Sequence, residues 1–106
     1  MEYLNKIELQ GVVGRVSVQS LGTACVMRFS MAVNRCYQLS NGNPVVETTW
    51  FDCSKSYPAD EPALELKKGD CVYVLGRLNI ERYTDQEGVE RQTTNVICRK
   101  VRRVAE

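Results

Sequence analysis

The segment from residue 23 to residue 34 alternates apolar side chains with mostly small or polar ones, and no other feature of the sequence restricts the fold more. Its alternate apolar positions are Cys25, Met27, Phe29, Met31 and Val33. A repeat of two places successive side chains on opposite faces of an extended chain. The segment therefore predicts a β-strand whose odd-numbered side chains face a core, while Arg28 faces away from it.

Four other segments carry strand patterns. They cover about residues 6–18, 45–56, 71–83 and 91–104. Ile7, Leu9 and Val13 share one parity in the first of these segments, which predicts a half-buried strand, and Val72, Val74, Leu78 and Ile80 are core candidates in the third. Val96 and Ile97 lie at the centre of the last segment. Glycines at positions 11 and 14 predict bends in a first strand that serves both halves of a closed sheet.

A short helix is expected between the third and fourth strands, over residues 61–67. Asp60 is suited to cap it, Pro62 suits its first turn and Gly69 suits its end. Three strands, a helix and two strands form the order of an OB fold, a five-stranded Greek-key barrel. The sequence thus predicts an all-β OB barrel with one short helix between strands 3 and 4. Periodicity alone leaves an SH3-like barrel open.

Length and composition fit one domain over residues 1–106. A chain of 106 residues is long enough for one domain and too short for two. No apolar run reaches the length of a membrane-spanning helix, and the charged residues near the start are unlike a signal peptide. We therefore expect a cytoplasmic protein.

The reactive residue types argue against catalysis and metal binding. The five cysteines form no Cys-x-x-Cys pair, and the sequence contains no histidine. Zinc sites ordinarily use such pairs or histidine, and histidine is the commonest general base. The cysteines are interpreted as small buried hydrophobic residues without disulfides. We expect no enzyme, no metal and no cofactor.

Single-stranded nucleic acid is bound by exposed rings that stack on bases and by cations that contact phosphates. The net charge of +1 does not by itself indicate such a partner. Any such argument rests on where the rings and charges lie, and four aromatic residues fall at strand ends or in loops, where they could project into a groove. The stacking candidates are Trp50, Tyr83, Tyr37 and Tyr57, and the phosphate-binding candidates are Arg28, Arg35, Lys55, Arg77, Arg82 and Arg91.

Several segments, in order, resemble the bacterial single-stranded-DNA-binding proteins. They are residues 5–11 (NKIELQG), 29–35 (FSMAVNR), 47–51 (ETTWF), 66–78 (LKKGDCVYVLGRL) and 83–88 (YTDQEG), the last followed by Arg91 and by Thr93 and Thr94. The resemblance covers about residues 5–104. It implies an OB fold, usually a homotetramer, that binds single-stranded DNA without sequence preference in replication, recombination and repair.

The resemblance also implies roles for particular residues. Trp50 is similar to the family's tryptophan at the start of strand three, and Tyr83 to the tryptophan before the last turn. Tyr37 takes an aromatic position after strand two. Tyr57 corresponds to a phenylalanine only if the alignment shifts by about one residue, and Lys55 shares that shift. Arg82 and Arg91 match basic positions that flank the last hairpin.

The sequence departs from this family in two respects. Tyrosine replaces tryptophan at two stacking positions, and the chain ends at Glu106 without the family's long Gly/Pro/Gln-rich tail. Recruitment of replication or repair partners through a tail is therefore not expected of this chain. Two alternatives stay open: a tail-less primosomal accessory protein that acts mainly as a protein adaptor, and an RNA-binding OB domain. A dimer is the alternative to the tetramer.

Overall fold

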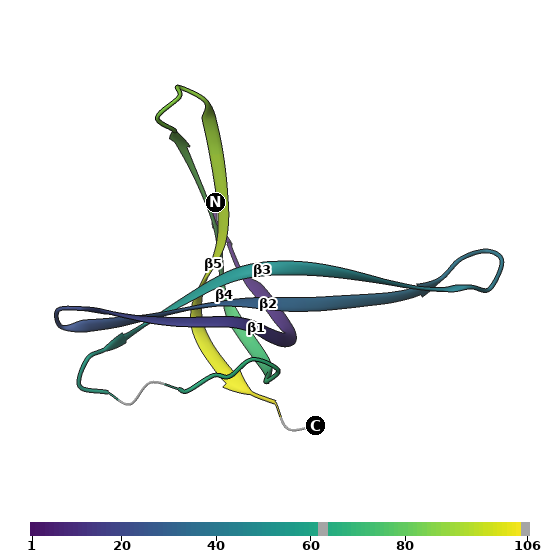
Figure 1. Cartoon of the computed structure of the whole chain (residues 1–106), viewed down its shortest axis with the longest axis horizontal. Helices are drawn as coiled ribbons and strands as arrows, with labels where there is room; N and C mark the ends of the chain where they lie inside the picture. Colours follow the sequence, from purple (N-terminus) through teal and green to yellow (C-terminus); the bar gives the residue numbers. More distant parts are fainter. Residues whose placement is uncertain (62–63, 105–106) are drawn as a thin grey trace.

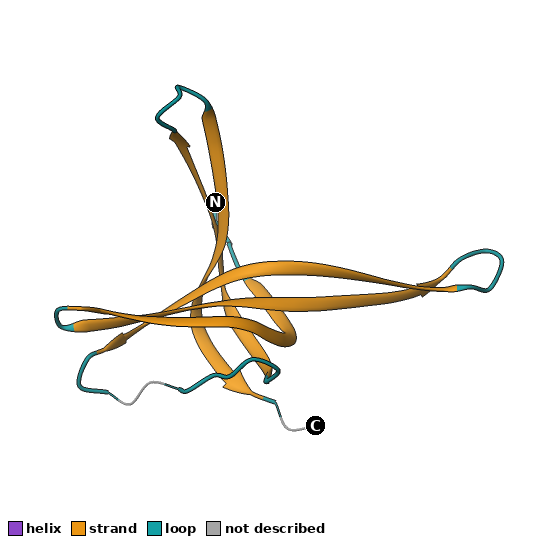
Figure 2. Ribbon diagram, in the orientation of Figure 1, coloured by secondary structure: helices purple, strands orange, loops and turns teal. Residues whose placement is uncertain are grey.

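The computed structural model describes residues 1–61 and 64–104 (Figure 1). Figure 2 shows that the described part of the chain folds into long strands joined by short turns and one longer loop. The five strands are β1 (Ile7–Leu21), β2 (Ala24–Gln38), β3 (Pro44–Pro58), β4 (Cys71–Thr84) and β5 (Glu90–Arg103). Each contains a segment that the period-two pattern predicts, and most extend a few residues further.

The strands close into a barrel in the order β1-β2-β3-β5-β4, with β4 returning to β1. Neighbouring strands are antiparallel except β3 and β5, which pair in parallel through Cys53 with Val96 and Ser54 with Ile97. This is the connectivity of a five-stranded Greek-key OB barrel. The predicted all-β barrel is therefore confirmed, and the SH3-like alternative falls away.

Closure depends on β1, which pairs with two strands. Ile7–Val12 pairs with β4, and from Val12 onward the strand pairs with β2, with a register shift between Val13 and Val16. A side chain at Gly11 would run into the Ala32 carbonyl of β2. Gly11 therefore permits the close approach at which β1 changes partner, as the sequence predicts for a bent strand.

The core contains the side chains on the inner faces of all five strands. Its buried members are Val13, Met27, Phe29, Met31, Cys53, Leu66, Val72, Val74, Val96 and Cys98. The parity predicted for β2 and for the start of β4 is therefore right. Ile80 was predicted to be in the core, but it is 51% exposed. It lies where β4 has left the barrel, so no second layer covers that face.

The predicted helix at residues 61–67 is not found in the described part of that segment. Positions 62 and 63 lie outside the described residues. Leu66 is buried and Leu64 packs against the core, while Glu65 between them is exposed. That spacing of two is the repeat of an extended chain. A seven-residue helix is also far below the roughly 12–15 residues that are marginal alone in water, so packing of the two leucines decides the conformation.

The β2–β3 and β4–β5 hairpins project from the barrel, and the β1–β2 hairpin projects on the side away from the β2–β3 tip (Figure 1). The β2–β3 arm, residues 34–48, extends far to one side, and the β4–β5 arm, residues 80–94, extends in another direction. The radius of gyration is 16.6 Å, against about 13 Å for a compact domain of this length. In the β2–β3 arm, β2 continues to Gln38 and β3 begins at Pro44, so the turn at its tip covers only residues 39–43.

The cysteines differ in environment. Within the described residues no two of them form a disulfide; Cys53 and Cys98 are buried, whereas Cys36 is exposed on the β2–β3 arm. The interpretation of the cysteines as buried hydrophobic residues is right for the two core positions and wrong for Cys36. Within the described ranges, no helix is long and apolar enough to cross a membrane.

Truncation of Met31 tests this core. Met31 is 0% exposed, and Met31→Ala is expected to lower the free energy of unfolding by about 2–5 kcal/mol because it leaves a cavity. The measurement is urea denaturation followed by circular dichroism. Val18→Ala, at a position 63% exposed, is the control and should change the value by less than about 0.5 kcal/mol. Equal effects of the two substitutions would contradict the described core.

Candidate nucleic-acid interface

Trp50 lies on the outer face of β3, opposite Ala32 of β2. It is 62% exposed, whereas its neighbour Phe51 points inward and packs against the core. The ring rests above β1: a Cβ atom built on Gly14 would lie 2.7 Å from the Trp50 Cζ3 atom. Gly14 therefore leaves the space that the indole ring occupies, and the rest of the Trp50 side chain stays largely exposed to solvent.

A groove continues from Trp50 along the same outer face and has a volume of about 510 Å³. We call it the outer groove; its polar lining includes Arg15, Arg28, Ser30, Asp52, Ser54 and Asn95. Arg28 Nη1 donates a hydrogen bond to Gln19 Oε1 at 2.9 Å, and Ser30 Oγ accepts one from the Arg15 backbone N–H at 2.9 Å. Two cations thus border a polar channel beside an exposed ring.

Tyr83 is 48% exposed on the β4–β5 arm and pairs with Arg91 of β5. The alternation of both strands places Asn79 and Asn95 on the same face of the arm as Tyr83. Asn79 Nδ2 donates to Asn95 Oδ1 at 3.2 Å, and Asn95 also lines the outer groove. The strand register therefore joins Trp50, the outer groove and Tyr83 along one continuous face.

Arg91 is held by a carboxylate at the tip of the arm. Its Nε atom donates to Asp85 Oδ2 at 2.6 Å, and Asp85 Oδ1 accepts hydrogen bonds from the backbone N–H groups of Glu87 and Val89. The Arg91 guanidinium and these N–H groups hold the pKa of Asp85 below its usual value. The turn is thereby fixed beside Tyr83, but part of the Arg91 charge is already compensated.

Tyr37 and Arg35 lie on the opposite face of the β2–β3 arm from Trp50. Tyr37 pairs with Val45 and Arg35 with Glu47, whereas Trp50 belongs to the other parity. The Arg35 guanidinium lies 5.3 Å from the centre of the Tyr37 ring, and the Tyr37 hydroxyl donates to Glu47 Oε1 at 2.8 Å. That hydrogen bond raises the pKa of Tyr37. These two candidates form a second, separate aromatic and basic surface.

Tyr57 and Lys55 lie on the inward face of β3. Tyr57 packs against the core, and the Lys55 ammonium lies 4.8 Å from the centre of its ring. Burial is the main reason why the pKa of Tyr57 is raised. Tyr57 thus packs at the end of the barrel, and it does not share the face that carries Trp50.

The remaining basic candidates lie on either side of the β4–β5 arm. Arg82 pairs with Gln92 and has the opposite parity to Tyr83, so it faces away from the outer groove. Arg77 lies nearer the barrel, where it lines a second hollow together with Lys55. Arg77 pairs with Ile97 and has the same parity as Asn79 and Tyr83. The strand register therefore places five of the candidate residues on one face: Trp50, Arg28, Tyr83, Arg91 and Arg77.

Sequence reasoning missed three contributors to this face: Gly14, Arg15 and Asn95. The sequence identified Gly14 only as a bend, because the position of the Trp50 ring above it depends on pairing between distant strands. Arg15 comes directly after Gly14 in the sequence, and it could have been proposed as a phosphate-binding residue on the same grounds as Arg28. Within the described ranges, no group of three or more Cys, Asp or Glu side chains is placed to hold a metal ion.

Comparison with known proteins agrees with this architecture. Residues 4–104 match the model of the single-strand binding protein family. A zebrafish (Danio rerio) mitochondrial single-stranded DNA-binding protein is 34% identical over 90% of this chain and 72% of its own length. The Neisseria meningitidis single-stranded DNA-binding protein is 32% identical over 93% of this chain, which spans 59% of that protein.

A solved structure extends the similarity to three dimensions. The Plasmodium falciparum SSB in complex with ssDNA superposes with a TM-score of 0.83 at 26% identity, and the match covers 99% of this chain and 98% of that one. The match includes all five strands and both arms, because it spans nearly the whole of each chain. The chain belongs to the single-strand binding protein family.

Proposed function

We propose that this protein binds single-stranded DNA without sequence preference, by stacking bases on Trp50 and Tyr83 and by contacting phosphates with Arg28 and Arg91. The observation that carries the proposal is the exposed Trp50 ring, seated on Gly14 beside a groove with a polar lining. Stacking explains the lack of sequence preference, since every base has a π-face.

The similar proteins support this function. The zebrafish and Neisseria relatives are named single-stranded DNA-binding proteins, and the Plasmodium structure contains ssDNA. We propose that this chain, like its family, acts in DNA replication, recombination and repair rather than in catalysis. We further propose a homotetramer as its assembly.

The other candidate residues take different roles in this proposal. Tyr37 and Arg35 would contact a strand that crosses to the second face of the β2–β3 arm, where their cation–π pair presents a ring and a charge together. Tyr57 packs at the barrel end, so its contribution is to position β3 rather than to stack a base. Arg82 faces away from the outer groove and adds to the local positive potential only.

Alanine substitution tests the two rings. Trp50→Ala and Tyr83→Ala are each expected to weaken binding of oligo-dT by about 1–3 kcal/mol, because each removes one stacking surface. Affinity is measured by anisotropy of a labelled oligonucleotide. Tyr3→Ala is the control, since Tyr3 is 91% exposed near the N-terminus and outside the outer face. Wild-type affinity of the Trp50 and Tyr83 double variant would reject the proposal.

A second prediction concerns the space that Gly14 leaves for the Trp50 ring. Gly14→Val is expected to displace the indole ring, since the new Cβ atom would lie 2.7 Å from both the ring and the Ser30 hydroxyl. Binding should weaken by roughly the value of one stacked base, about 1–3 kcal/mol, and the Trp50 emission maximum should shift. Gly42→Asn, at an open turn with φ of 86°, is the control. An unchanged emission spectrum and affinity would show that the ring does not depend on Gly14.

A further inference from the structure

Two cysteine thiols meet in the core across the parallel pair of β3 and β5. Cys53 of β3 pairs with Val96, and Cys98 follows Val96 by two residues, so its side chain shares the same inner face. The Cys98 Sγ atom donates to the Val96 carbonyl at 3.7 Å, which directs the sulfur back along β5 toward the residue opposite Cys53. The Cys53 and Cys98 thiols form a hydrogen bond with each other. The fold thus brings together two thiols from distant parts of the sequence.

The two thiols differ in how readily they ionise. The hydrogen bond with Cys53 lowers the pKa of Cys98, and the Ser54 backbone N–H and the Lys55 charge act in the same direction against the effect of burial. The hydrogen bond with Cys98, together with burial, raises the pKa of Cys53. Because the thiolate is the nucleophilic form of cysteine, Cys98 is the thiol that reacts first with an oxidant.

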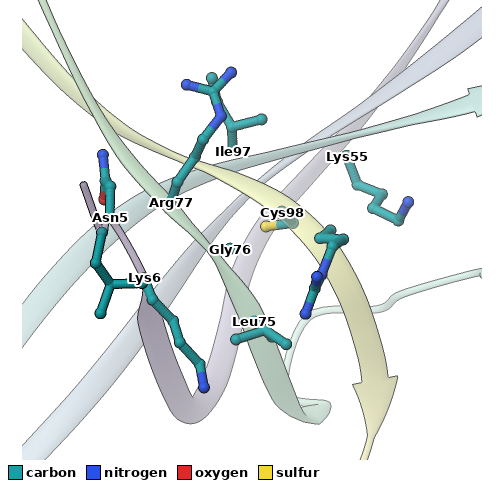
Figure 3. Close-up of a pocket in the computed structure, with 10 residues that line it drawn as sticks. Asn5, Lys6, Lys55, Leu75, Gly76, Arg77, Ile97 and Cys98 are labelled. Atoms are coloured by element: carbon teal, nitrogen blue, oxygen red, sulfur yellow. The ribbon is translucent and has the colours of Figure 1, made fainter. Parts of the chain in front are cut away.

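Cys98 also borders the second hollow, whose volume is about 590 Å³ and whose lining includes Lys55, Arg77 and Arg99. Figure 3 shows the Cys98 sulfur, in yellow, near the middle of this lining. The Cys98 residue is only 6% exposed, so large reagents are kept from it. A peroxide is small and uncharged, and the hollow gives it a route to the thiol with the lower pKa.

The pairing of β3 with β5 leaves room for the two sulfur atoms to join. A disulfide holds its two Cβ atoms about 3.5–4.5 Å apart. β3 and β5 pair through two residue pairs, Cys53 with Val96 and Ser54 with Ile97, whereas β1 and β4 pair through six. Few ladder hydrogen bonds hold β3 against β5, so a small shift toward the disulfide geometry disrupts little of the barrel.

We propose that Cys53 and Cys98 form a reversible disulfide in the folded protein when it meets hydrogen peroxide. The Cys98 thiolate attacks one peroxide oxygen and the O–O bond breaks. Cys98 becomes a sulfenic acid, and the hydroxide that leaves takes up the proton that Cys98 lost. The Cys53 sulfur then attacks the Cys98 sulfur, the S–O bond breaks, and the departing oxygen takes the Cys53 proton to form water.

The reaction is balanced, since two thiols are oxidised to one disulfide while one hydrogen peroxide is reduced to two waters. A dithiol reverses it by thiol–disulfide exchange. The product would tie β3 to β5 at the place where they pair through the fewest residues. The inference goes beyond the proposed function, because no step in it involves DNA.

Peptide mapping tests for the disulfide. Cys36→Ser is the starting protein, because Cys36 is exposed and would otherwise join two copies. After treatment with hydrogen peroxide and alkylation of the remaining thiols, trypsin releases Cys53 within residues 36–55 and Cys98 within residues 92–99. Neither peptide then contains another cysteine. Mass spectrometry should find most of these two peptides joined, and dithiothreitol should separate them.

Substitution of each thiol in turn tests the order of the two steps. In Cys36→Ser/Cys53→Ala, the sulfenic acid at Cys98 has no thiol to resolve it, so dimedone should label Cys98. In the matched variant Cys36→Ser/Cys98→Ala, Cys53 should stay unlabelled. Circular dichroism before and after oxidation verifies that each protein is folded.

Either of two results would overturn the inference. One is the absence of a Cys53–Cys98 link in folded Cys36→Ser after oxidation, and the other is dimedone on Cys53 rather than on Cys98. The first result needs only a substitution on the exposed arm, so it decides the question even where a core substitution prevents folding. Neither measurement involves oligo-dT, so failure of the proposed function is scored separately.

Discussion

The barrel depends on one strand making two sets of hydrogen bonds. β1 pairs with β4 through its first half and with β2 through its second, and the exchange occurs where Gly11 lies against the Ala32 carbonyl. Closure of a sheet removes its free edges and encloses a core. This exchange of partners in β1 positions the other strands, because it brings β4 and β5 back against β1 and β3.

Closure of the barrel also determines where the candidate binding residues lie. The strands are longer than the barrel, so β2 with β3 and β4 with β5 continue as arms on which alternate side chains still face opposite ways. Inside the barrel, one of the two sets of alternate side chains on each strand is buried. Beyond the barrel, on the arms, both sets are exposed to solvent. The outer parity is continuous from Trp50 through the outer groove to Tyr83. The alternation of side chains that places Met27 and Met31 in the core thus also places the Trp50 and Tyr83 rings on the outer face.

The sequence predicts the local part of this structure and misses the part that depends on distant pairing. The sequence located all five strands, and period two identified the inward set of β2, since that pattern needs only neighbouring residues. Ile80 fits the same parity yet is exposed, because the sequence does not indicate where the barrel ends. The helix at residues 61–67 rested on local capping signals, whereas Leu64 and Leu66 pack as an extended pair. The contact between Trp50 and Gly14 joins residues 36 positions apart, so no pattern of neighbouring residues predicts it.

The two arms project from the barrel in different directions (Figure 1). A flexible polymer in contact with both of them cannot lie straight, so attachment draws its ends closer together. Mechanical tension on such a polymer performs work against that shortening. For a strand bound to both arms, the occupancy of the protein would then depend on pulling force as well as on concentration, and a taut strand would release the protein more readily than a slack one.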